Sequence, residues 1–292
     1  GMFIIKIEGG LGNQLFQYSL GRLLEIKYNK IVSYDFSSYE EGYKYTPRKF
    51  LLDKFNTKLR VATKDEIYKT LYPFGVVSKC VHFFKKAINK FIFKKYHVAF
   101  EPTLLSELNK LNTAYLGGYW QSYKYVLPVI EQLRNECTLV DDSSLVTNSN
   151  YQLALSTESV AVHIRRGDYV GNSKDLQPLE KSYYENAVKV ISEKIENPKF
   201  FIFSDDIPWV KSNMSDIFDE STVYVEGRDL KDYEELLLIS TCKHSIIANS
   251  TFSWWGAILN KNTHKVIISP KNWKNIHFKD DSDLCPMEWV RA

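Results

Sequence analysis

Two adjacent arginines follow a predicted buried strand in the second half of the chain. The strand covers residues 159–164, and the motif at its end reads HIRRGD, from His163 to Asp168. A guanidinium group can bind two phosphate oxygens at once and keeps its charge at any relevant pH. The motif predicts a phosphate or diphosphate site in which Arg165 contacts the ligand. Arg166 is expected to be paired within the protein, with Asp168 as a candidate partner, and solvated charges at a strand end are the alternative interpretation.

A second anion-binding pattern is NSTFSWWGA, residues 249–257. A predicted strand over 244–248 runs into small hydroxyl residues and then into a predicted helix over 251–259. Free backbone N–H groups at such a helix start, with the Ser250 and Thr251 hydroxyls beside them, form an anion site. Helix capping by the same hydroxyls is the alternative, and the two roles are compatible.

Carboxylates end two further predicted strands, over residues 200–203 and 222–225. Asp205 and Asp206 follow the first strand, and Glu226 follows the second. A carboxylate at such a position can accept hydrogen bonds from ribose hydroxyls or guanine N–H groups. Capping of the following helix is the alternative for one of the two aspartates, and for Glu226 it is the favoured one.

The loop GGLGNQ, which begins at Gly9, imitates a dinucleotide fingerprint. Gly10 and Gly12 match G-x-G, but Leu15 stands where the third glycine would be. Asp35 ends the second predicted strand, as the acidic residue of that fingerprint does. A tight strand-to-helix turn without a ligand is the alternative.

The two side-chain amides of the same loop, Asn13 and Gln14, are not explained by a turn alone. They could cap the helix that follows or reach into a ligand site.

All of these motifs lie where a predicted strand ends. Strand, turn, helix and strand over residues 2–35 resemble the opening of a Rossmann layer, and strands alternate with helices after residue 150. Such βα units build parallel sheets, which bind ligands at the carboxyl ends of their strands. The polar segment 141–150 is the predicted linker. We therefore expect an α/β protein of two Rossmann-like domains, residues 1–150 with a largely helical insertion over 37–116, and residues 151–292.

Composition narrows the functional classes. The chain of 292 residues is 44% hydrophobic and 25% charged, as in a folded globular protein, and its net charge of +3 does not favour a nucleic-acid partner. The four cysteines form no C-x-x-C pair, and there is neither an H-x-x-x-H pair nor a D-x-D between apolar strands, so no metal site is expected. The sequence shows no signal peptide and no apolar stretch of about 20 residues, which predicts a cytoplasmic location.

Four motifs, GGLGNQLFQY, HIRRGDY, FSDD with Trp209 shortly after, and NSTFSWWGA, occur in this order. Together they resemble the family 11 glycosyltransferases, the α-1,2-fucosyltransferases, and most of all their bacterial branch. The resemblance implies a GT-B-like fold, with GDP-β-L-fucose held by the C-terminal domain and the acceptor on the N-terminal side. It also implies inverting, metal-independent transfer of fucose to the 2-hydroxyl of a terminal galactose. H-x-R-R-x-D is also similar to a motif of α-1,6- and protein O-fucosyltransferases, so another linkage stays open, as does a non-catalytic GDP-sugar or glycan-binding protein. The partial fingerprint also leaves a nicotinamide oxidoreductase open.

The resemblance assigns roles to residues of this sequence. The expected GDP-fucose site comprises His163, Arg165, Asp168, Asp205, Asp206, Glu226, Asn249, Ser250, Thr251 and Phe252. The expected acceptor-side loop comprises Gly10, Gly12, Asn13 and Gln14. Arg165, Asn13 and Asp35 are the predicted catalytic residues.

The identity of a general base is open at this stage. By position the candidates are Glu8, Asp35, Glu40 and Glu41, and Asp35 is preferred. A base is unnecessary if the transition state is strongly oxocarbenium-like, because the hydroxyl then loses its proton late.

One segment lies outside the motifs. Residues 79–95 read KCVHFFKKAINKFIFKK, with six lysines and no acidic residue. On a helix this pattern is typical of a membrane-surface segment, which would suit a lipid-linked acceptor at the inner membrane. A helix packed on its own domain is the alternative and is favoured.

Overall fold

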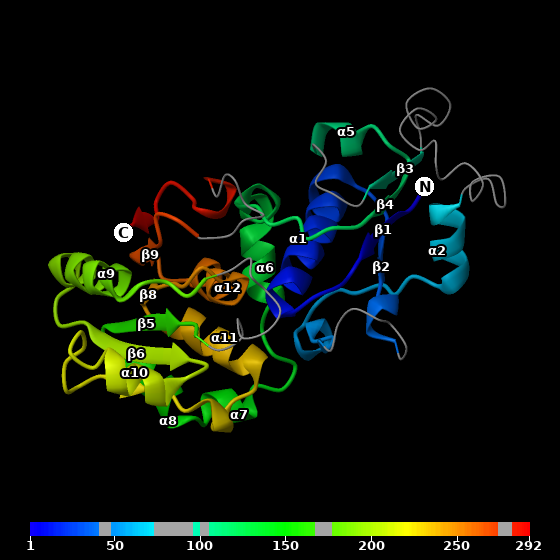
Figure 1. Ribbon diagram of the computed structural model, residues 1–292. Helices are drawn as coiled ribbons and strands as arrows, with labels where there is room; N and C mark the ends of the chain where they lie inside the picture. Colours follow the sequence, from blue (N-terminus) through cyan, green and yellow to red (C-terminus); the bar gives the residue numbers. More distant parts are fainter. Residues whose placement is uncertain (41–47, 73–95, 100–104, 167–176, 274–281) are drawn as a thin grey trace. The chain divides into compact units, whose positions relative to one another are not determined.

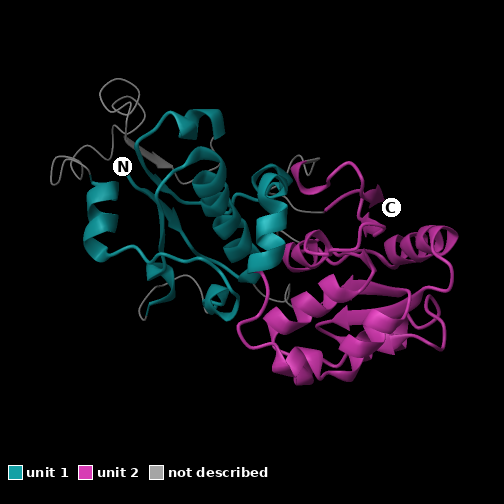
Figure 2. Cartoon of the chain, turned by 180° about the vertical axis from the view of Figure 1, so that it is seen from behind, with its two compact units in different colours: residues 1–136 teal, residues 137–292 magenta. Residues whose placement is uncertain are grey.

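The computed structural model describes residues 1–40, 48–72, 96–99, 105–166, 177–273 and 282–292. The chain divides into two compact units, residues 1–136 and 137–292, which Figure 2 colours separately. Each unit contains its own sheet of parallel strands (Figure 1). The boundary expected after residue 150 falls instead within α8 (Ser149–Ser156) of the second unit.

The sheet of the first unit has the strand order β2-β1-β4-β3. Its strands are β1 (Phe3–Lys6), β2 (Val32–Asp35), β3 (Tyr96–Ala99) and β4 (Thr113–Leu116). β1 pairs with β2 on one side and with β4 on the other, both in parallel. The apolar strands β1 and β2 are buried almost throughout because a parallel sheet is covered on both faces.

The helix α1 (Leu11–Tyr28) starts directly after the glycine loop. Nearly every residue from Leu11 to Leu24 is buried, and the helix ends at Asn29, whose φ of 53° is left-handed. The other α-helices in the described residues of this unit are α2 (Lys64–Leu71), α5 (Leu105–Asn109) and α6 (Ile130–Glu136). In the described part of residues 37–116 the expected helical insertion is wrong in part, because the strand β3 runs through it.

A buried ion pair joins the first and last helices of this unit. The Arg22 guanidinium donates from Nε to Glu136 Oε1 over 2.8 Å and from Nη2 to Glu136 Oε2 over 2.9 Å. Tyr18 donates its hydroxyl to the same carboxylate. Because both charged groups are buried, each depends on the other for its stability.

The second unit has a six-stranded parallel sheet in the order β10-β9-β8-β5-β6-β7. Its strands are β5 (Ser159–Ile164), β6 (Lys199–Ser204), β7 (Val223–Tyr224), β8 (His244–Ile246), β9 (Ile267–Ser269) and β10 (Val290–Arg291). Where the structure describes this unit, its α-helices are α7 (Ser143–Val146), α8, α9 (Lys181–Lys194), α10 (Ile207–Asn213), α11 (Asp232–Thr241) and α12 (Thr251–Ile258). The predicted strand over 159–164 is confirmed, whereas the predicted linker is wrong, since its residues build α7 and the start of α8.

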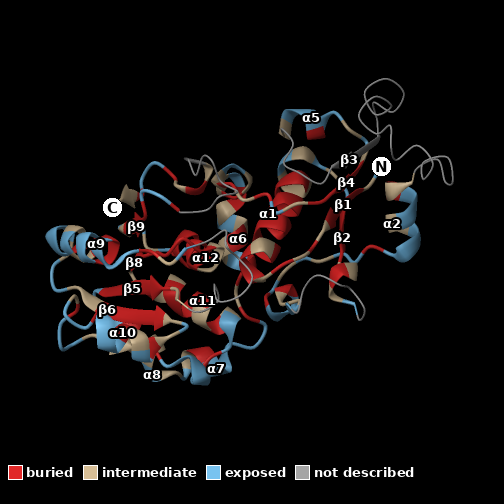
Figure 3. Cartoon of the chain, viewed as in Figure 1, coloured by how far each residue is buried: buried red, intermediate tan, exposed pale blue. Residues whose placement is uncertain are grey.

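Burial explains why the central strands of this unit read as continuous apolar runs. All six residues of β5 and the middle four of β6 are buried, while α9 turns exposed residues outward (Figure 3). The core between sheet and helices includes Val160, Val162, Phe200 and Ile202 from the strands. The arrangement places the carboxyl ends of β5, β6 and β8 on one edge.

Candidate active site

The order in which strands are added to the sheet of the second unit changes direction between the parallel neighbours β5 and β8. β5 pairs with β6 on one side and with β8 on the other, so the loops that follow β5 and β8 leave in opposite directions. Ligands of open α/β sheets bind at this kind of switch point. The two strongest sequence motifs flank it, since Arg165 follows β5 and Ser250 follows β8.

His163 occupies the end of β5 and is 8% exposed. Its ring centroid lies 5.6 Å from that of Phe252, in the first turn of α12. Burial, and then the charge of Arg165, lower the pKa of His163 to about 4, so the imidazole is neutral at neutral pH. Among the described residues Nδ1 has no hydrogen-bond partner. An unpaired buried nitrogen at a switch point calls for a ligand.

The two arginines after β5 have different surroundings. The Arg166 guanidinium carbon lies 3.4 Å from the centroid of the Trp209 ring, and the Arg166 backbone N–H donates to Asp205 Oδ1 over 2.6 Å. Arg166 is therefore paired within the protein, as expected, but its guanidinium group stacks on the Trp209 ring of α10. Its expected partner Asp168 lies outside the described residues. Arg165 is half-buried beside His163 and supplies positive charge there.

The acidic residues of this edge separate into different roles. Asp206 caps α10 by accepting a hydrogen bond from the Trp209 backbone N–H over 3.1 Å, so the capping alternative describes it. Asp205 is exposed and fastens the loop after β5 to the loop after β6. The capping role favoured for Glu226 is wrong, because its side chain caps no helix and lies 3.8 Å from Lys211 Nζ on the surface.

The start of α12 combines a hydroxyl cap with the backbone N–H groups of a helix first turn. The Ser250 hydroxyl accepts from the Phe252 N–H over 3.1 Å, while Thr251 and Phe252 are half-buried. Asn249 is buried and donates from Nδ2 to the carbonyls of Gln177 and Trp273, so it braces the loops on both sides. Its Oδ1 has no partner among the described residues. Helix N–H groups next to Arg165 form an electropositive site.

Glu235 is a residue of this edge that sequence reasoning missed. It lies on α11, and burial, followed by the charges of Asp232 and Asp205, raises its pKa to about 7. The carboxyl is therefore partly protonated at neutral pH and can donate a hydrogen bond. No motif marks this residue, because its environment combines α11 with Asp205 of the loop after β6.

In the first unit β1 and β4 are adjacent parallel strands, so the segments that follow them start at the same edge of the sheet. The glycine loop follows β1, and a turn over residues 117–121 follows β4. Gln17 of α1 joins them, since its Oε1 accepts from the Glu8 N–H and its Nε2 donates to the Gly118 carbonyl, both over 3.0 Å. The two loops therefore form one surface of the first unit.

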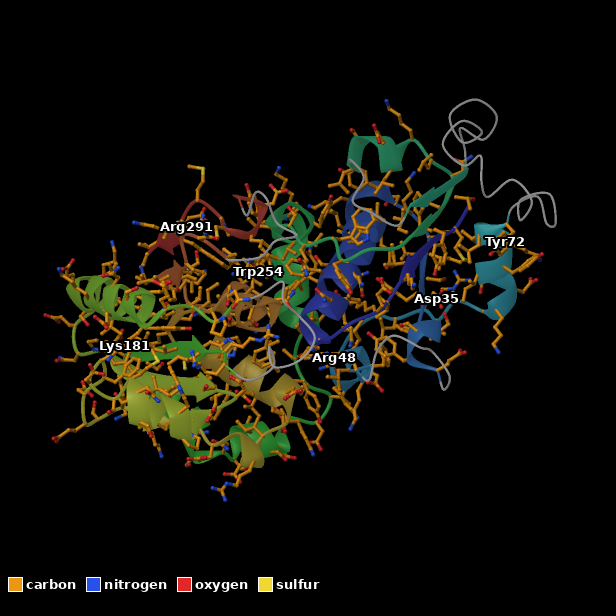
Figure 4. The ribbon with its side chains drawn as sticks, in the orientation of Figure 1. Asp35, Arg48, Tyr72, Lys181, Trp254 and Arg291 are labelled. Carbon is orange, nitrogen blue, oxygen red and sulfur yellow. The ribbon has the colours of Figure 1, made fainter. Side chains whose placement is uncertain are left out.

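The glycine loop is shorter than the sequence suggests. α1 begins at Leu11, so Gly12, Asn13 and Gln14 form its first turn. Gly9 has a left-handed φ of 84°. A Cβ on Gly10 would lie 3.4 Å from a guanidinium nitrogen of Arg48, which sequence reasoning missed (Figure 4).

The two side-chain amides of the loop, Asn13 and Gln14, have different hydrogen-bond partners. Asn13 is half-buried, and its Oδ1 accepts from Gln121 Nε2 over 2.6 Å. Gln14 is fully buried, and its amide bonds the backbone of Gly9, Lys49 and Leu51. The prediction that Gln14 belongs to the acceptor side is therefore corrected, because its hydrogen bonds hold the loop itself.

Asp35 is buried at 2% exposure, and both its oxygens are engaged. Oδ1 accepts from the Ser37 N–H over 2.9 Å, and Oδ2 accepts from the Tyr115 hydroxyl over 2.6 Å. This environment assigns Asp35 a structural role. Glu8, at the end of β1, is partly exposed beside Lys6 and is the better-placed candidate base, while Glu41 lies outside the described residues.

The described residues contain neither a cluster of metal-binding side chains nor a membrane-spanning helix. No group of three or more His, Cys, Asp or Glu side chains that could hold a metal ion occurs among them. No helix in the same part of the chain is long and apolar enough to cross a membrane. The basic segment 79–95 lies outside the described residues, so its membrane-surface hypothesis stays a prediction.

Comparison with known proteins shows which family the chain belongs to. Residues 1–292 match the sequence profile of Glycosyl transferase family 11. The chain belongs to glycosyltransferase family 11. It is 34% identical to the Escherichia coli protein named alpha-1,2-colitosyltransferase, over 99% of this chain and 98% of that one. It is 29% identical to the O-antigen biosynthesis glycosyltransferase WbnK of Escherichia coli, over 91% and 93% of the two chains. Human galactoside alpha-(1,2)-fucosyltransferase 1 is 27% identical over 49% of this chain and 42% of its own.

The fold of this family 11 member is GT-B-like. The structure of an Arabidopsis thaliana FUT1 mutant in complex with GDP covers 93% of this chain, 71% of its own, with a TM-score of 0.50 and 12% identity. The expected GT-B-like α/β fold with parallel sheets is thereby confirmed.

Proposed function

We propose that this glycosyltransferase transfers L-fucose from GDP-β-L-fucose to the 2-hydroxyl of a terminal galactose in an oligosaccharide. The α-1,2 linkage is supported by the names of two relatives, and the galactoside acceptor by that of the human relative. The observation that carries the proposal is the arrangement after β5 and β8. There the charge of Arg165, the backbone donors of α12 and the unpaired nitrogen of His163 converge on one switch point.

The bound diphosphate would be stabilised at this switch point. During transfer the bond between the fucose anomeric carbon and the β-phosphate oxygen breaks, and its electron pair stays on GDP. Arg165 and the N–H groups at the start of α12 stabilise the negative charge that develops on that oxygen. Asn249 and Asp205 hold the two loops in place. This provides the charge stabilisation that a metal ion gives in other transferases, so transfer is expected without one.

The acceptor reacts with inversion. The galactose 2-oxygen forms the new bond to the anomeric carbon from the face opposite the diphosphate, and its proton passes to a base or to water. Glu8 is the carboxylate that the geometry favours for this step, in place of Asp35.

A second donor has specific support. The relative that matches this chain over nearly its whole length transfers colitose, a sugar that lacks the 3-hydroxyl of fucose. A site that hydrogen-bonds this hydroxyl rejects the deoxy sugar, whereas a site without such a bond accepts it. The ratio of kcat/KM for GDP-fucose and GDP-colitose decides between the two donors.

The deciding assay combines donor, acceptor and chelator. Purified protein, GDP-fucose and a terminal β-galactoside in EDTA should give GDP and a product whose NMR spectrum shows the new bond at the galactose 2-oxygen. Absence of GDP release with either donor, or a bond to another hydroxyl, would overturn the proposal. Activity that returns only on adding Mg²⁺ or Mn²⁺ would overturn its metal-independent form.

A further inference from the structure

The turn after β4 is built in an unusual backbone conformation. Gly118 has a φ of 107° and Trp120 a φ of 55°, so a bulky residue occupies the left-handed region. Trp120 is 1% exposed, and its ring meets the Tyr125 ring edge-on at 5.5 Å. Backbone strain of this kind persists only where the surroundings hold it, and it clusters at functional sites. Its effect here is to bury Trp120 while the preceding Tyr119 remains 45% exposed.

The Tyr119 ring packs over the glycine loop. A Cβ placed on Gly9 would lie 3.4 Å from Cε1 of the Tyr119 ring and 3.1 Å from Nδ2 of Asn13. Gly9, with its left-handed φ, thus leaves room for a ring and an amide side by side. An aromatic face and a hydrogen-bonding group therefore occupy neighbouring positions on the surface.

A second amide completes this cluster. Gln121 Nε2 donates to Asn13 Oδ1 over 2.6 Å, which directs the Gln121 Oε1 acceptor and the Asn13 Nδ2 donors away from the pair. Both side chains are half-buried. The pair offers neutral donors and acceptors in fixed positions, which suits uncharged hydroxyl groups better than ions.

The cluster is also tied to the candidate base. Gln17 bonds the Glu8 N–H and the Gly118 carbonyl, so the end of β1 and the turn that carries Tyr119 are fixed by one side chain. Burial, and then the charge of the Glu8 carboxylate, raise the pKa of the Tyr39 hydroxyl, so Tyr39 lies within electrostatic reach of Glu8. Tyr39 itself donates to the Gly9 carbonyl over 2.7 Å.

We propose that Tyr119 and the Asn13–Gln121 pair form the acceptor subsite, which binds the terminal galactoside of an oligosaccharide. A galactopyranose has an apolar face of C–H groups and a rim of hydroxyls. The tyrosine ring stacks on the apolar face, as large rigid aromatic side chains do at interfaces, and the amide pair binds hydroxyls. The inference rests on the proposed transfer reaction. It assigns Tyr119 and Gln121 to acceptor binding, whereas Gln14 holds the glycine loop.

Steady-state kinetics with Tyr119→Ala tests this subsite. The KM for the galactoside should rise about tenfold or more, because the stacking contact is lost. The KM for GDP-fucose and the Kd for GDP should stay at their wild-type values. Tyr119→Phe keeps the ring and should remain near wild type, whereas Gln121→Ala should also raise the acceptor KM.

Tyr68→Ala is the matched control, since Tyr68 of α2 is 41% exposed but packs on Tyr72. It should change neither KM, and thermal unfolding of each variant checks that the fold is retained. An unchanged acceptor KM in Tyr119→Ala, or an equal rise in the donor KM, would overturn the subsite.

The two proposals fail in different ways. Wild-type protein that neither binds GDP nor releases it from GDP-fucose would refute the transfer reaction itself. If the wild-type protein releases GDP normally, but Tyr119→Ala and Gln121→Ala leave the acceptor KM unchanged, the subsite alone would be refuted.

Discussion

Arg165 bears the charge that the proposed reaction needs, whereas its neighbour Arg166 is occupied by the Trp209 ring. We predict that Arg165→Ala lowers kcat by about a hundred- to a thousandfold, the typical cost of one transition-state donor. Arg60→Ala, which removes an exposed guanidinium of the first unit, is the control and should leave kcat unchanged. Equal losses in both variants would show that the effect is not specific to the site.

The neutral imidazole of His163 makes stability depend on pH. Its folded pKa of about 4 lies below the ordinary 6.5, so between these values the unfolded chain binds a proton that the folded chain does not. Stability should therefore fall as the pH drops from about 6.5 to about 4 and then level off, by roughly 3 kcal/mol in all from this group. Urea unfolding at several pH values should show a smaller loss in His163→Gln, and an identical slope in both proteins would contradict the burial argument.

Asp35 and Glu8 can be separated by stability and rate. Asp35→Asn should lower the free energy of unfolding by about 1–3 kcal/mol, because an amide cannot accept from both the Ser37 N–H and the Tyr115 hydroxyl. Glu8→Gln should leave the melting temperature nearly unchanged and lower kcat. If Glu8→Gln retains full kcat, the hydroxyl proton leaves without this base.

At the scale of elements, α12 is positioned by a close approach to α11. A Cβ on Gly256 would lie 2.5 Å from Cγ2 of Ile239. Gly256→Ala should destabilise the protein by about 1–3 kcal/mol through overpacking, which exceeds the helix-propensity gain. It should also weaken GDP binding, because α12 shifts relative to β5. Gly21→Ala, which brings a Cβ against Tyr34 in the first unit, should destabilise too but leave the GDP affinity unchanged in calorimetry.

The elements that sequence patterns predicted are the ones whose pattern was unambiguous. β5 is a fully buried and largely apolar strand, and α12 starts at a hydroxyl cap, so the range of β5 and the start of α12 could be read from the residues. β10 has two residues and owes its existence to pairing with β9. The polar segment around Asn148 resembles a linker. However, the Asn148 side chain accepts a hydrogen bond from the Asn150 N–H and thereby caps the start of α8. Local composition does not reveal such capping.

The site was predictable to the same degree. Motifs at strand ends located Arg165 and Ser250, because parallel strands bring their carboxyl ends to one edge. Burial on nearly all sides of α1 hid the fact that Gln14 faces inward. Tyr119 and Glu235 depend on contacts between separate segments, which no single motif records.

For the whole molecule, we propose that the second unit binds the donor and the first unit the acceptor. This predicts which unit GDP protects from hydrogen exchange. Hydrogen exchange in saturating GDP should slow at the ends of β5 and β8 and at the start of α12, while the sheet of the first unit keeps its rates. NAD at the same concentration should protect neither unit. Protection confined to residues 1–136 would place the nucleotide in the wrong unit and refute the donor assignment.

The chain passes between its two units only once, after Glu136. Because the proposed donor and acceptor groups fall on opposite sides of that point, a single recombination event there would exchange one specificity and keep the other. Family members could thus acquire new acceptors while inheriting an unchanged nucleotide-sugar half. A gene chimera joined at this position, with residues 1–136 from this chain and the remainder from a relative, would be expected to combine one parent's acceptor with the other parent's donor.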